Sequence, residues 1–212
     1  QKISAITCTQ NSKYSYNEIT SKIGYKIESL AIPHQIHSAE VLFVKSSGDF
    51  KNCDGLITNN GSVVLSLQTA DCTPIFLFDE LTGLRGLVHA GWRGVVAGIA
   101  NNAIRCMVEN GSIVKNIHVF LGPSICMQCY QVGSEVASQF KNGSKKNHID
   151  DKWLVNLHKE IKYQLLDEGL ISTQIDSSSV CTYENENCCS YRRDGQKAGR
   201  MYSFLGVENG FI

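Results

Sequence analysis

Hydrophobic and polar residues follow two different periods along this chain. Short apolar runs bounded by polar or turn-forming residues predict strands. Six such runs lie at Val41–Val44, Leu56–Thr58, Val63–Leu67, Ile75–Phe78, Leu84–His89 and Ile117–Leu121. Two later segments, near Ser179–Tyr183 and Met201–Phe204, also have the character of extended chain. The pattern therefore predicts a cluster of strands early in the chain and isolated strands later.

Apolar residues spaced three and four apart predict helices between and after these strands. The helices are expected at Val95–Glu109, Val132–Phe140 and Trp153–Glu168. Strands and helices are interleaved without strict alternation, which favours a mixed sheet with helices packed on it. No linker, repeat or low-complexity segment interrupts the pattern. We therefore expect an α/β (α+β) fold that forms a single domain over residues 1–212.

Composition narrows the choice of partners and compartment. The 212-residue chain has a formal net charge of zero, which argues against a surface that binds nucleic acid. The most apolar region, residues 63–78, is interrupted by Gln68, Asp71 and Pro74, so no membrane span is expected. The nine cysteines are odd in number and irregularly spaced, unlike those of a disulfide scaffold. We expect reduced thiols and a cytoplasmic protein.

The segment Gly86–Gly94 carries the strongest chemical signal. An apolar run ends at His89, and a loop with two glycines and Arg93 leads into the first predicted helix. A histidine at a strand end is well placed for a site. The free N–H groups at the start of the following helix favour an anion. This combination indicates an enzyme site rather than core packing.

Three residues at the ends of apolar runs are candidate metal ligands. They are His37, Cys72 and His89. Two imidazoles and a thiolate suit Zn²⁺ or a copper ion, and three protein ligands leave a fourth position open for chemistry. The spacing matches no recognised motif, so two hydrogen-bonded histidines and a buried cysteine remain the alternative.

The same residues allow a second chemistry, in which Cys72 is a nucleophile and His89 its base. Asp71 could orient that base, but a neighbour of Cys72 on a strand would point to the opposite face. The arginines Arg93, Arg192 and Arg193 are candidates for binding phosphate or carboxylate. Their alternative role is that of solvated residues around turns.

Other motifs carry weaker signals. Cys126 and Cys129 form a C-x-x-C pair, but no second pair follows at the spacing of a four-cysteine zinc site. Metal or redox function is therefore not expected there. His118, His148 and His158 stand alone in the sequence and are expected to be structural or exposed.

With these residues identified, the sequence resembles the laccase-domain family, whose members are described as broad purine nucleoside phosphorylases and were formerly known as multicopper polyphenol oxidases. The matching segments are Gln35–His37, Cys53–Gly55, Thr69–Pro74, His89–Gly94, Leu121–Pro123, Tyr130–Gly133, Cys181–Thr182, Tyr191–Gly195 and Gly199–Met201. The chain departs from the family at Ser38, where a glycine is common, and at Gln131, where a glutamate is common.

The resemblance implies a fold of the kind grouped with cytotoxic-necrotizing-factor-like cysteine hydrolases. It implies a metal site, usually zinc, at His37, Cys72 and His89. It also implies phosphorolysis of adenosine and inosine, cleavage of methylthioadenosine and deamination of adenosine. Copper-dependent oxidation of phenols has been ascribed to the family as well.

The first hypothesis is therefore a zinc enzyme that acts on a purine nucleoside and phosphate. Zinc would activate water for attack on C6 of adenine, and Asp71 is a candidate proton donor. Arg93 and the helix N-terminus would hold phosphate, with Arg192 or Arg193 as a second contact. The alternatives are a copper-dependent phenol oxidase, a metal-free hydrolase that uses Cys72 and His89, and a purely structural metal site.

Overall fold

A six-stranded mixed sheet forms the centre of the molecule. The computed structural model describes residues 3–9 and 16–207. The strands of this sheet run in the order β13 (Ile175–Ser177), β9 (Ile117–Leu121), β7 (Thr73–Asp79), β8 (Arg85–Ala90), β5 (Gly55–Thr58) and β3 (Val41–Phe43). The central pairs are antiparallel and the two edge pairs are parallel. The expected mixed α/β class is confirmed.

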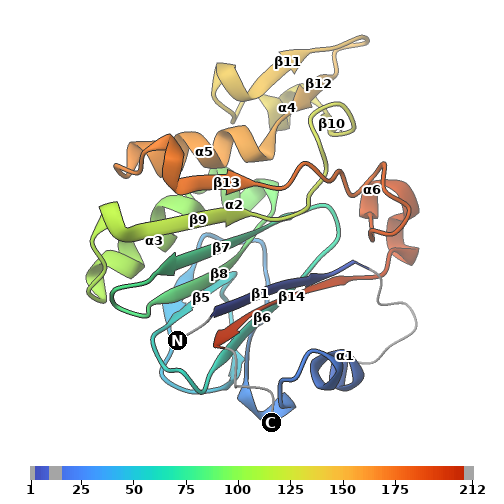
Figure 1. Ribbon diagram of the computed structural model, residues 1–212. Helices are drawn as coiled ribbons and strands as arrows, with labels where there is room; N and C mark the ends of the chain where they lie inside the picture. The colour runs from blue at the N-terminus through green and yellow to red at the C-terminus, as the bar shows by residue number, and fades with distance from the viewer. Residues whose placement is uncertain (1–2, 10–15, 208–212) are drawn as a thin grey trace.

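A second, five-stranded sheet lies against one face of the first. Its order is β1 (Ile3–Cys8), β14 (Met201–Val207), β6 (Val64–Thr69), β2 (Leu30–Pro33) and β4 (Gly48–Phe50). The layer between the sheets contains Leu65 and Leu67 of β6 together with Phe76 and Leu87 of the first sheet. Figure 1 shows the two sheets stacked, with α1 (Tyr16–Lys22) beside the second.

Helices cover the other face of the six-stranded sheet. These are α2 (Trp92–Val96), α3 (Ile99–Glu109) and α5 (Leu157–Asp167). Their apolar side chains share one core with Ile75, Leu77 and Val88 of the sheet. Successive side chains of β7 and β8 therefore enter opposite apolar layers, which explains why these strands form continuous hydrophobic runs in the sequence.

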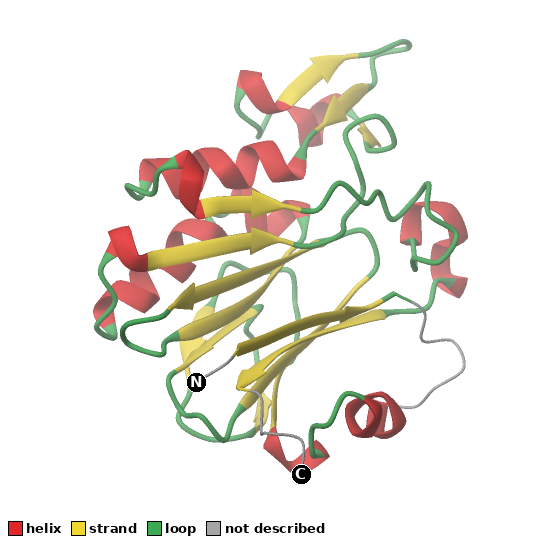
Figure 2. Cartoon of the chain, in the orientation of Figure 1, coloured by secondary structure: helices red, strands yellow, loops and turns green. Residues whose placement is uncertain are grey.

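A small third sheet stands at one end of the molecule (Figure 2). It consists of β10 (Gln131–Val132), β12 (Trp153–Val155) and β11 (Lys145–Asn147), in that order. Two short helices, α4 (Ser134–Ala137) and α6 (Tyr191–Asp194), complete the named helices. Across the described ranges, none of the helices has the length and apolar run needed to cross a bilayer.

The three predicted helices are each shorter than expected, for identifiable reasons. Gly98 has φ +84°, and this left-handed residue divides the segment predicted as Val95–Glu109 between α2 and α3. In the segment Val132–Phe140 only α4 is helical. The residues Trp153–Val155, predicted as helix, pair between two strands as β12. Asn156 then caps α5 by accepting a hydrogen bond from Lys159 N at 2.9 Å.

Most predicted strands lie within observed strands, but one does not. The segment Ser179–Tyr183 makes only a single bridge, between Ser124 and Cys181, and the observed strand β13 lies just before it.

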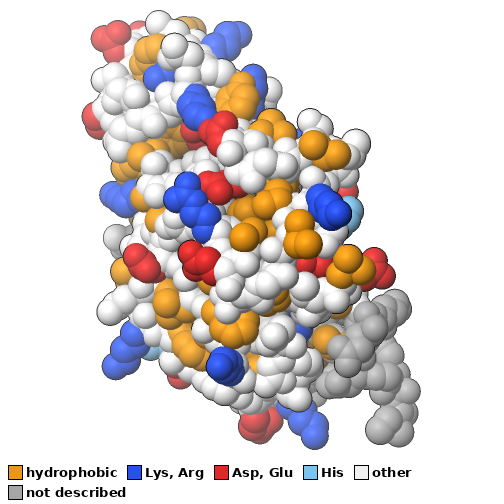
Figure 3. All heavy atoms as spheres, turned by 90° about the vertical axis from the view of Figure 1, so that its left-hand side faces the viewer, with side chains coloured by type: hydrophobic (Ala, Val, Ile, Leu, Met, Phe, Trp, Pro, Cys, Tyr) orange, Lys and Arg blue, Asp and Glu red, His pale blue; other side chains and the backbone are white. Residues whose placement is uncertain are grey.

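On the molecular face in Figure 3, basic and acidic side chains of the described residues are interspersed, and neither sign of charge forms a patch of its own.

Candidate active site

The ends of three chain segments bring the predicted ligands together. His37 precedes β3, Cys72 lies in the turn from β6 to β7, and His89 belongs to β8. Their ligand atoms all lie within 4.8 Å of one another. The two imidazole rings stand nearly perpendicular, with centroids 4.8 Å apart and an interplanar angle of 84°. The antiparallel pairing of Thr73 with Ala90 places the Cys72 turn beside the end of β8.

This donor set fits a zinc or copper ion. Two imidazole nitrogens and one thiol sulfur converge at a spacing that a single ion can bridge. Burial is graded across the set, because His89 is 3% exposed, Cys72 is half-buried and His37 is exposed. All three residues also line the cleft described below, so an ion that they held would be accessible from it.

A buried carboxylate, Asp54, positions both histidines. Its Oδ1 accepts hydrogen bonds from His89 Nδ1 at 2.8 Å and from His37 N at 2.9 Å. Its Oδ2 accepts from the backbone N–H groups of Ile36 and Ser38, and from Ser38 Oγ at 2.8 Å. Burial alone would raise the pKa of Asp54, but the hydrogen bonds from His89 and Ser38 outweigh it and lower the pKa to about 2.

The loop that carries His37 is held at two further points. The Gln35 side chain accepts a hydrogen bond from Gln68 N at 2.9 Å and donates one to Gln68 O at 2.7 Å. His37 has φ +61°, a conformation that turns successive N–H groups toward one carboxylate. Ser38 adds a hydroxyl that donates to Asp54 Oδ2.

Electrostatics favour a thiolate at Cys72. Burial raises the pKa of Cys72, but attraction to His89 and a hydrogen bond from His37 lower it to about 6. Burial likewise lowers the pKa of His89, whereas Cys72 and Asp54 raise it to about 9. Because His89 Nδ1 is engaged by Asp54, the other ring nitrogen is directed to Cys72 or to a metal. The Cys72 thiol therefore ionises readily near neutral pH, and the thiolate can act as a metal ligand or as a nucleophile.

Asp71, considered as a partner of the histidine base, has other contacts. Its Oδ1 accepts from Thr182 Oγ1 at 2.7 Å, and its Oδ2 accepts from Arg192 N at 2.7 Å. The residue that orients His89 is instead Asp54, which the sequence pattern does not single out as a site residue. Asp71 has φ +82° in the turn and lies in the cleft wall, where it fastens α6. A signal for Asp54 was present, since a charged residue stands between Cys53 and Gly55 at the start of a buried strand.

A cleft of about 690 Å³ opens over the three candidate ligands. Its wall includes the aromatic residues Trp92 and Tyr130 and the arginines Arg93, Arg192 and Arg200. The Arg93 guanidinium lies 4.5 Å from the Trp92 ring centroid, and that of Arg192 lies 5.4 Å from the Tyr130 ring centroid. Flat apolar surfaces and cations side by side suit an aromatic ligand that carries or accompanies an anion.

Two of the expected anion contacts differ from the prediction. Arg193 does not line the cleft, because its guanidinium donates to the carbonyl oxygens of Thr182, Tyr183, Asn185 and Cys188. It holds that loop in place instead. The helix that follows His89 is α2, which has five residues, so its aligned dipole is small. Arg93 and Arg192 remain the candidate anion ligands at the cleft.

Gly91 provides a direct test of whether His37, Cys72 and His89 bind a metal ion. A methyl group at this position would lie 2.9 Å from His37 Cδ2 and 3.1 Å from Cys72 Sγ. The backbone of Gly91 has φ −76°, which any residue can adopt, so the effect of Gly91→Ala comes from this contact alone. We expect zinc affinity to fall by about tenfold or more, measured by competition with a chromophoric chelator.

The matched control for that variant is Gly86→Ala in β8. Its methyl group would lie 3.0 Å from Ile57 Cγ1, in the core and away from the ligands. This variant should lower the melting temperature without changing zinc affinity. If Gly91→Ala and the wild type bound zinc with equal affinity, the inference that a methyl group at position 91 displaces His37 and Cys72 would be wrong.

Comparison with known proteins assigns the chain to a family. The model of the family described as multi-copper polyphenol oxidoreductase laccase matches residues 9–208. The chain belongs to this family. Several relatives in the laccase-like family carry the names of nucleoside enzymes. A purine nucleoside phosphorylase of Deinococcus radiodurans is 32% identical over 190 residues, which cover 89% of this chain and 74% of the relative.

Other members extend the comparison. Adenosine deaminase RL5, from an unknown prokaryotic organism, is 30% identical over 87% of this chain and 78% of its own length. Among solved structures, YlmD of Geobacillus stearothermophilus superimposes with a TM-score of 0.86 at 28% identity, covering 90% of this chain and 78% of that one. YfiH of Bacillus licheniformis gives a TM-score of 0.84 at 26% identity over 91% of this chain and 79% of that one. The fold is therefore that of YlmD and YfiH.

Proposed function

We propose that this protein is a zinc-dependent enzyme of purine nucleosides. Its reactions would be phosphorolysis of adenosine, inosine or methylthioadenosine and hydrolytic deamination of adenosine. The observation that carries the proposal is the convergence of His37, Cys72 and His89 within 4.8 Å at the cleft that contains Arg93 and Arg192. The names of the relatives, a purine nucleoside phosphorylase and an adenosine deaminase, support the same substrate class.

The residues of the chain have distinct tasks in this proposal. A zinc ion held by the three ligands would supply a Lewis acid that lowers the pKa of water. Asp54 fixes the ring of His89 and the backbone of His37, so that both imidazoles keep one orientation. Trp92 and Tyr130 offer flat surfaces for the purine, and Arg93 and Arg192 offer donors for phosphate.

The two reactions make different demands, and Arg93→Ala separates them. Loss of a charge-assisted contact to phosphate is expected to raise the KM for phosphate by about tenfold or more. Deamination uses no phosphate, so its kcat/KM for adenosine should stay within about twofold of wild type. Arg105→Ala, which removes an arginine on α3 paired with Glu168, is the matched control. Equal losses in both reactions would contradict a phosphate-binding role for Arg93.

The activity itself is tested by chromatography of adenosine incubated with metal-analysed protein. Adenine that forms only in the presence of phosphate, together with inosine that forms in its absence, is the expected result. No turnover of adenosine, inosine or methylthioadenosine by protein with a filled site would overturn the proposal. Assays of phenol oxidation against free copper ion test the copper alternative, since the same donor set accepts copper.

A second candidate function rests on a specific observation. Cys72, His89 and Asp54 line up as a thiol, a base and the carboxylate that orients the base. This is the arrangement of a cysteine hydrolase, and the pKa of Cys72, lowered to about 6, suits a nucleophile. A hydrolase of this kind would keep its activity in the presence of a chelator, whereas the zinc enzyme would lose it. Amide substrates are the first class to test.

A further inference from the structure

A second group of metal-binding side chains lies outside the candidate active site. We call it the cysteine cluster, and it consists of Cys126, Cys129, Cys181 and Glu184. The sulfur and carboxylate oxygen atoms all lie within 4.8 Å of one another. In the sequence the C-x-x-C pair stands without a second pair, so no metal site was expected there. The fold supplies the missing partners from a segment much later in the chain.

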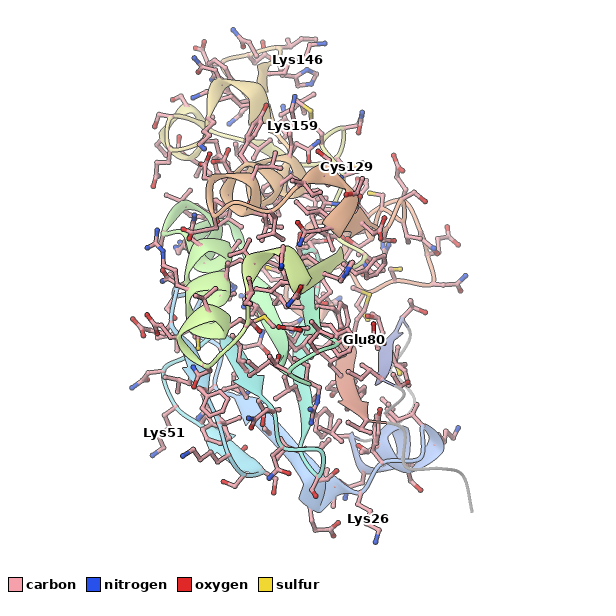
Figure 4. The ribbon with its side chains drawn as sticks, turned by 60° about the vertical axis from the view of Figure 1, so that its left-hand side comes forward. Lys26, Lys51, Glu80, Cys129, Lys146 and Lys159 are labelled. Carbon is pink, nitrogen blue, oxygen red and sulfur yellow. The ribbon has the colours of Figure 1, made fainter. Side chains whose placement is uncertain are left out.

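Strand pairing explains why these two segments meet. The first segment follows β9 and the second follows β13, and these strands are parallel neighbours in the six-stranded sheet. Chains that leave parallel neighbours emerge at the same edge of the sheet. Here they run side by side, with a bridge between Ser124 and Cys181 and a hydrogen bond from Thr182 N to Ser124 O at 3.1 Å. Figure 4 shows Cys129 near β13, which is drawn in orange.

The two segments present their ligands with the same local geometry. One has the spacing C-x-x-C and the other the spacing C-x-x-E. In the first, Tyr130 N donates to Cys126 O at 3.0 Å, and in the second, Asn185 N donates to Cys181 O at 3.0 Å. Each turn therefore closes over five residues and brings its first and fourth side chains to the same cluster. Two turns with C-x-x-C spacing are a common framework of a structural zinc site, and here the carboxylate of Glu184, also a zinc ligand type, stands where the fourth cysteine would be.

The contacts inside the cysteine cluster also favour a cation. Cys126 N donates to Cys181 Sγ at 3.3 Å, a backbone contact that favours negative charge on this buried sulfur. The Cys129 thiol donates to Glu184 Oε1 at 3.4 Å, so a proton stands between two ligands that a metal ion would join. All nine cysteines lie within the described residues, and none of them forms a disulfide there. Three adjacent thiols and a carboxylate gain most from a divalent cation that neutralises their ionised forms.

We propose that the cysteine cluster binds a structural Zn²⁺ ion. Thiolates select zinc over magnesium or calcium, and four protein ligands complete a tetrahedral site with no position left for a substrate. Binding releases the thiol protons to solvent, and no redox change is involved. The proposal is independent of the function assigned to the cleft.

The ion would fasten one wall of the substrate cleft to the central sheet. Thr182, next to Cys181, donates to Asp71, and Asp71 in turn holds the first turn of α6 through Arg192 N. The Arg193 guanidinium binds carbonyl oxygens of the same loop. A zinc ion in the cysteine cluster therefore supports the position of Arg192 without contacting the cleft.

Metal analysis of single variants tests the proposal, with zinc as the added metal. Cys129→Ser should reduce bound zinc by one ion per chain, and Cys72→Ser should reduce it by one ion at the other site. Cys106→Ser, which changes a half-buried thiol on α3, is the matched control and should bind as much zinc as the wild type. Removal of one structural ligand should also lower the melting temperature by several degrees.

Cobalt distinguishes the two sites spectroscopically. The Cys72→Ser protein keeps three thiolates for Co²⁺, whereas Cys129→Ser keeps one at the active site. The sulfur-to-cobalt charge-transfer absorbance per bound ion should therefore be about threefold stronger in Cys72→Ser. If Cys129→Ser does not fold, Glu184→Gln preserves the thiolates and should weaken zinc binding by about tenfold with the charge-transfer band retained.

One outcome would overturn the inference. A folded Cys72→Ser protein that contains no zinc and takes up no Co²⁺ would show that the cysteine cluster is not a metal site. The same result would leave the nucleoside activity of the wild type untouched, so the failure of this inference and the failure of the proposed function are distinguishable.

Discussion

Cys72→Ala is expected to empty the candidate active site and to lower adenosine turnover by about a thousandfold. A zinc ion held by the three candidate ligands would lose its only thiolate there, and the two imidazoles that remain would bind it weakly. Lewis-acid stabilisation worth several kcal/mol then disappears, which corresponds to a factor of about a thousand in rate. The measurement is zinc content and kcat/KM on the same protein sample.

Two companion variants make this result decisive. Cys106→Ala changes a thiol on α3, far from the ligands in the fold, and should keep both zinc and activity. Cys72→His replaces the thiolate by another zinc ligand but removes the nucleophile. Activity in Cys72→His that a chelator abolishes and zinc restores would exclude the cysteine-hydrolase mechanism. Full activity and full zinc content in Cys72→Ala would contradict the proposed site.

Asp54→Ala should combine a large loss of stability with a large loss of metal affinity. The carboxylate is fully buried and accepts hydrogen bonds from His89 and from three successive backbone N–H groups. Its removal leaves these donors unsatisfied and His89 without its counter-charge, which costs about 3–5 kcal/mol. Zinc affinity should fall by about 10–100-fold because both histidines lose their orientation.

The contribution of Asp54 also has a defined pH dependence. The pKa of Asp54 is lowered from 3.8 to about 2 in the folded protein. Because the pKa is lower in the folded protein, the unfolded chain binds the proton more readily. The ionised Asp54 carboxylate therefore stabilises the folded protein fully at pH values above 3.8. This stabilisation is lost as the pH falls from there toward 2. The difference in unfolding free energy between wild type and Asp54→Ala should shrink over that interval.

Asp79→Ala is the matched control for Asp54→Ala. Asp79 is as buried as Asp54, but it lies at the end of β7 away from the Cys72 turn. There its Oδ1 accepts hydrogen bonds from Leu81 N and Thr82 N. This variant should lose stability in urea unfolding of the metal-free protein but keep the zinc affinity of the wild type. If both variants lost affinity to the same extent, the effect would be one of general destabilisation, and the positioning role of Asp54 would be wrong.

The central strands were predictable because burial on both faces leaves a continuous apolar run. Leu87 packs between the two sheets and Val88 packs under the helices, so β8 is apolar throughout until His89. Short edge strands lack this signal. Gly48–Phe50 and Ile175–Ser177 each pair with one neighbour, and their register comes from that neighbour rather than from their own pattern. Trp153–Val155 has helical spacing but pairs as a strand.

The sequence by itself determined the local features of the site. His37 comes just before an apolar run, Cys72 just after one and His89 at the end of another, and this placement made them candidates, because sites are commonly built where strands meet loops. Tertiary structure alone decided which groups meet. Asp54 reaches His89 only through the pairing of β5 with β8, and Glu184 reaches Cys129 only through the pairing of β13 with β9. Such contacts depend on long-range pairing and shared burial, whereas period and turn chemistry act over a few residues.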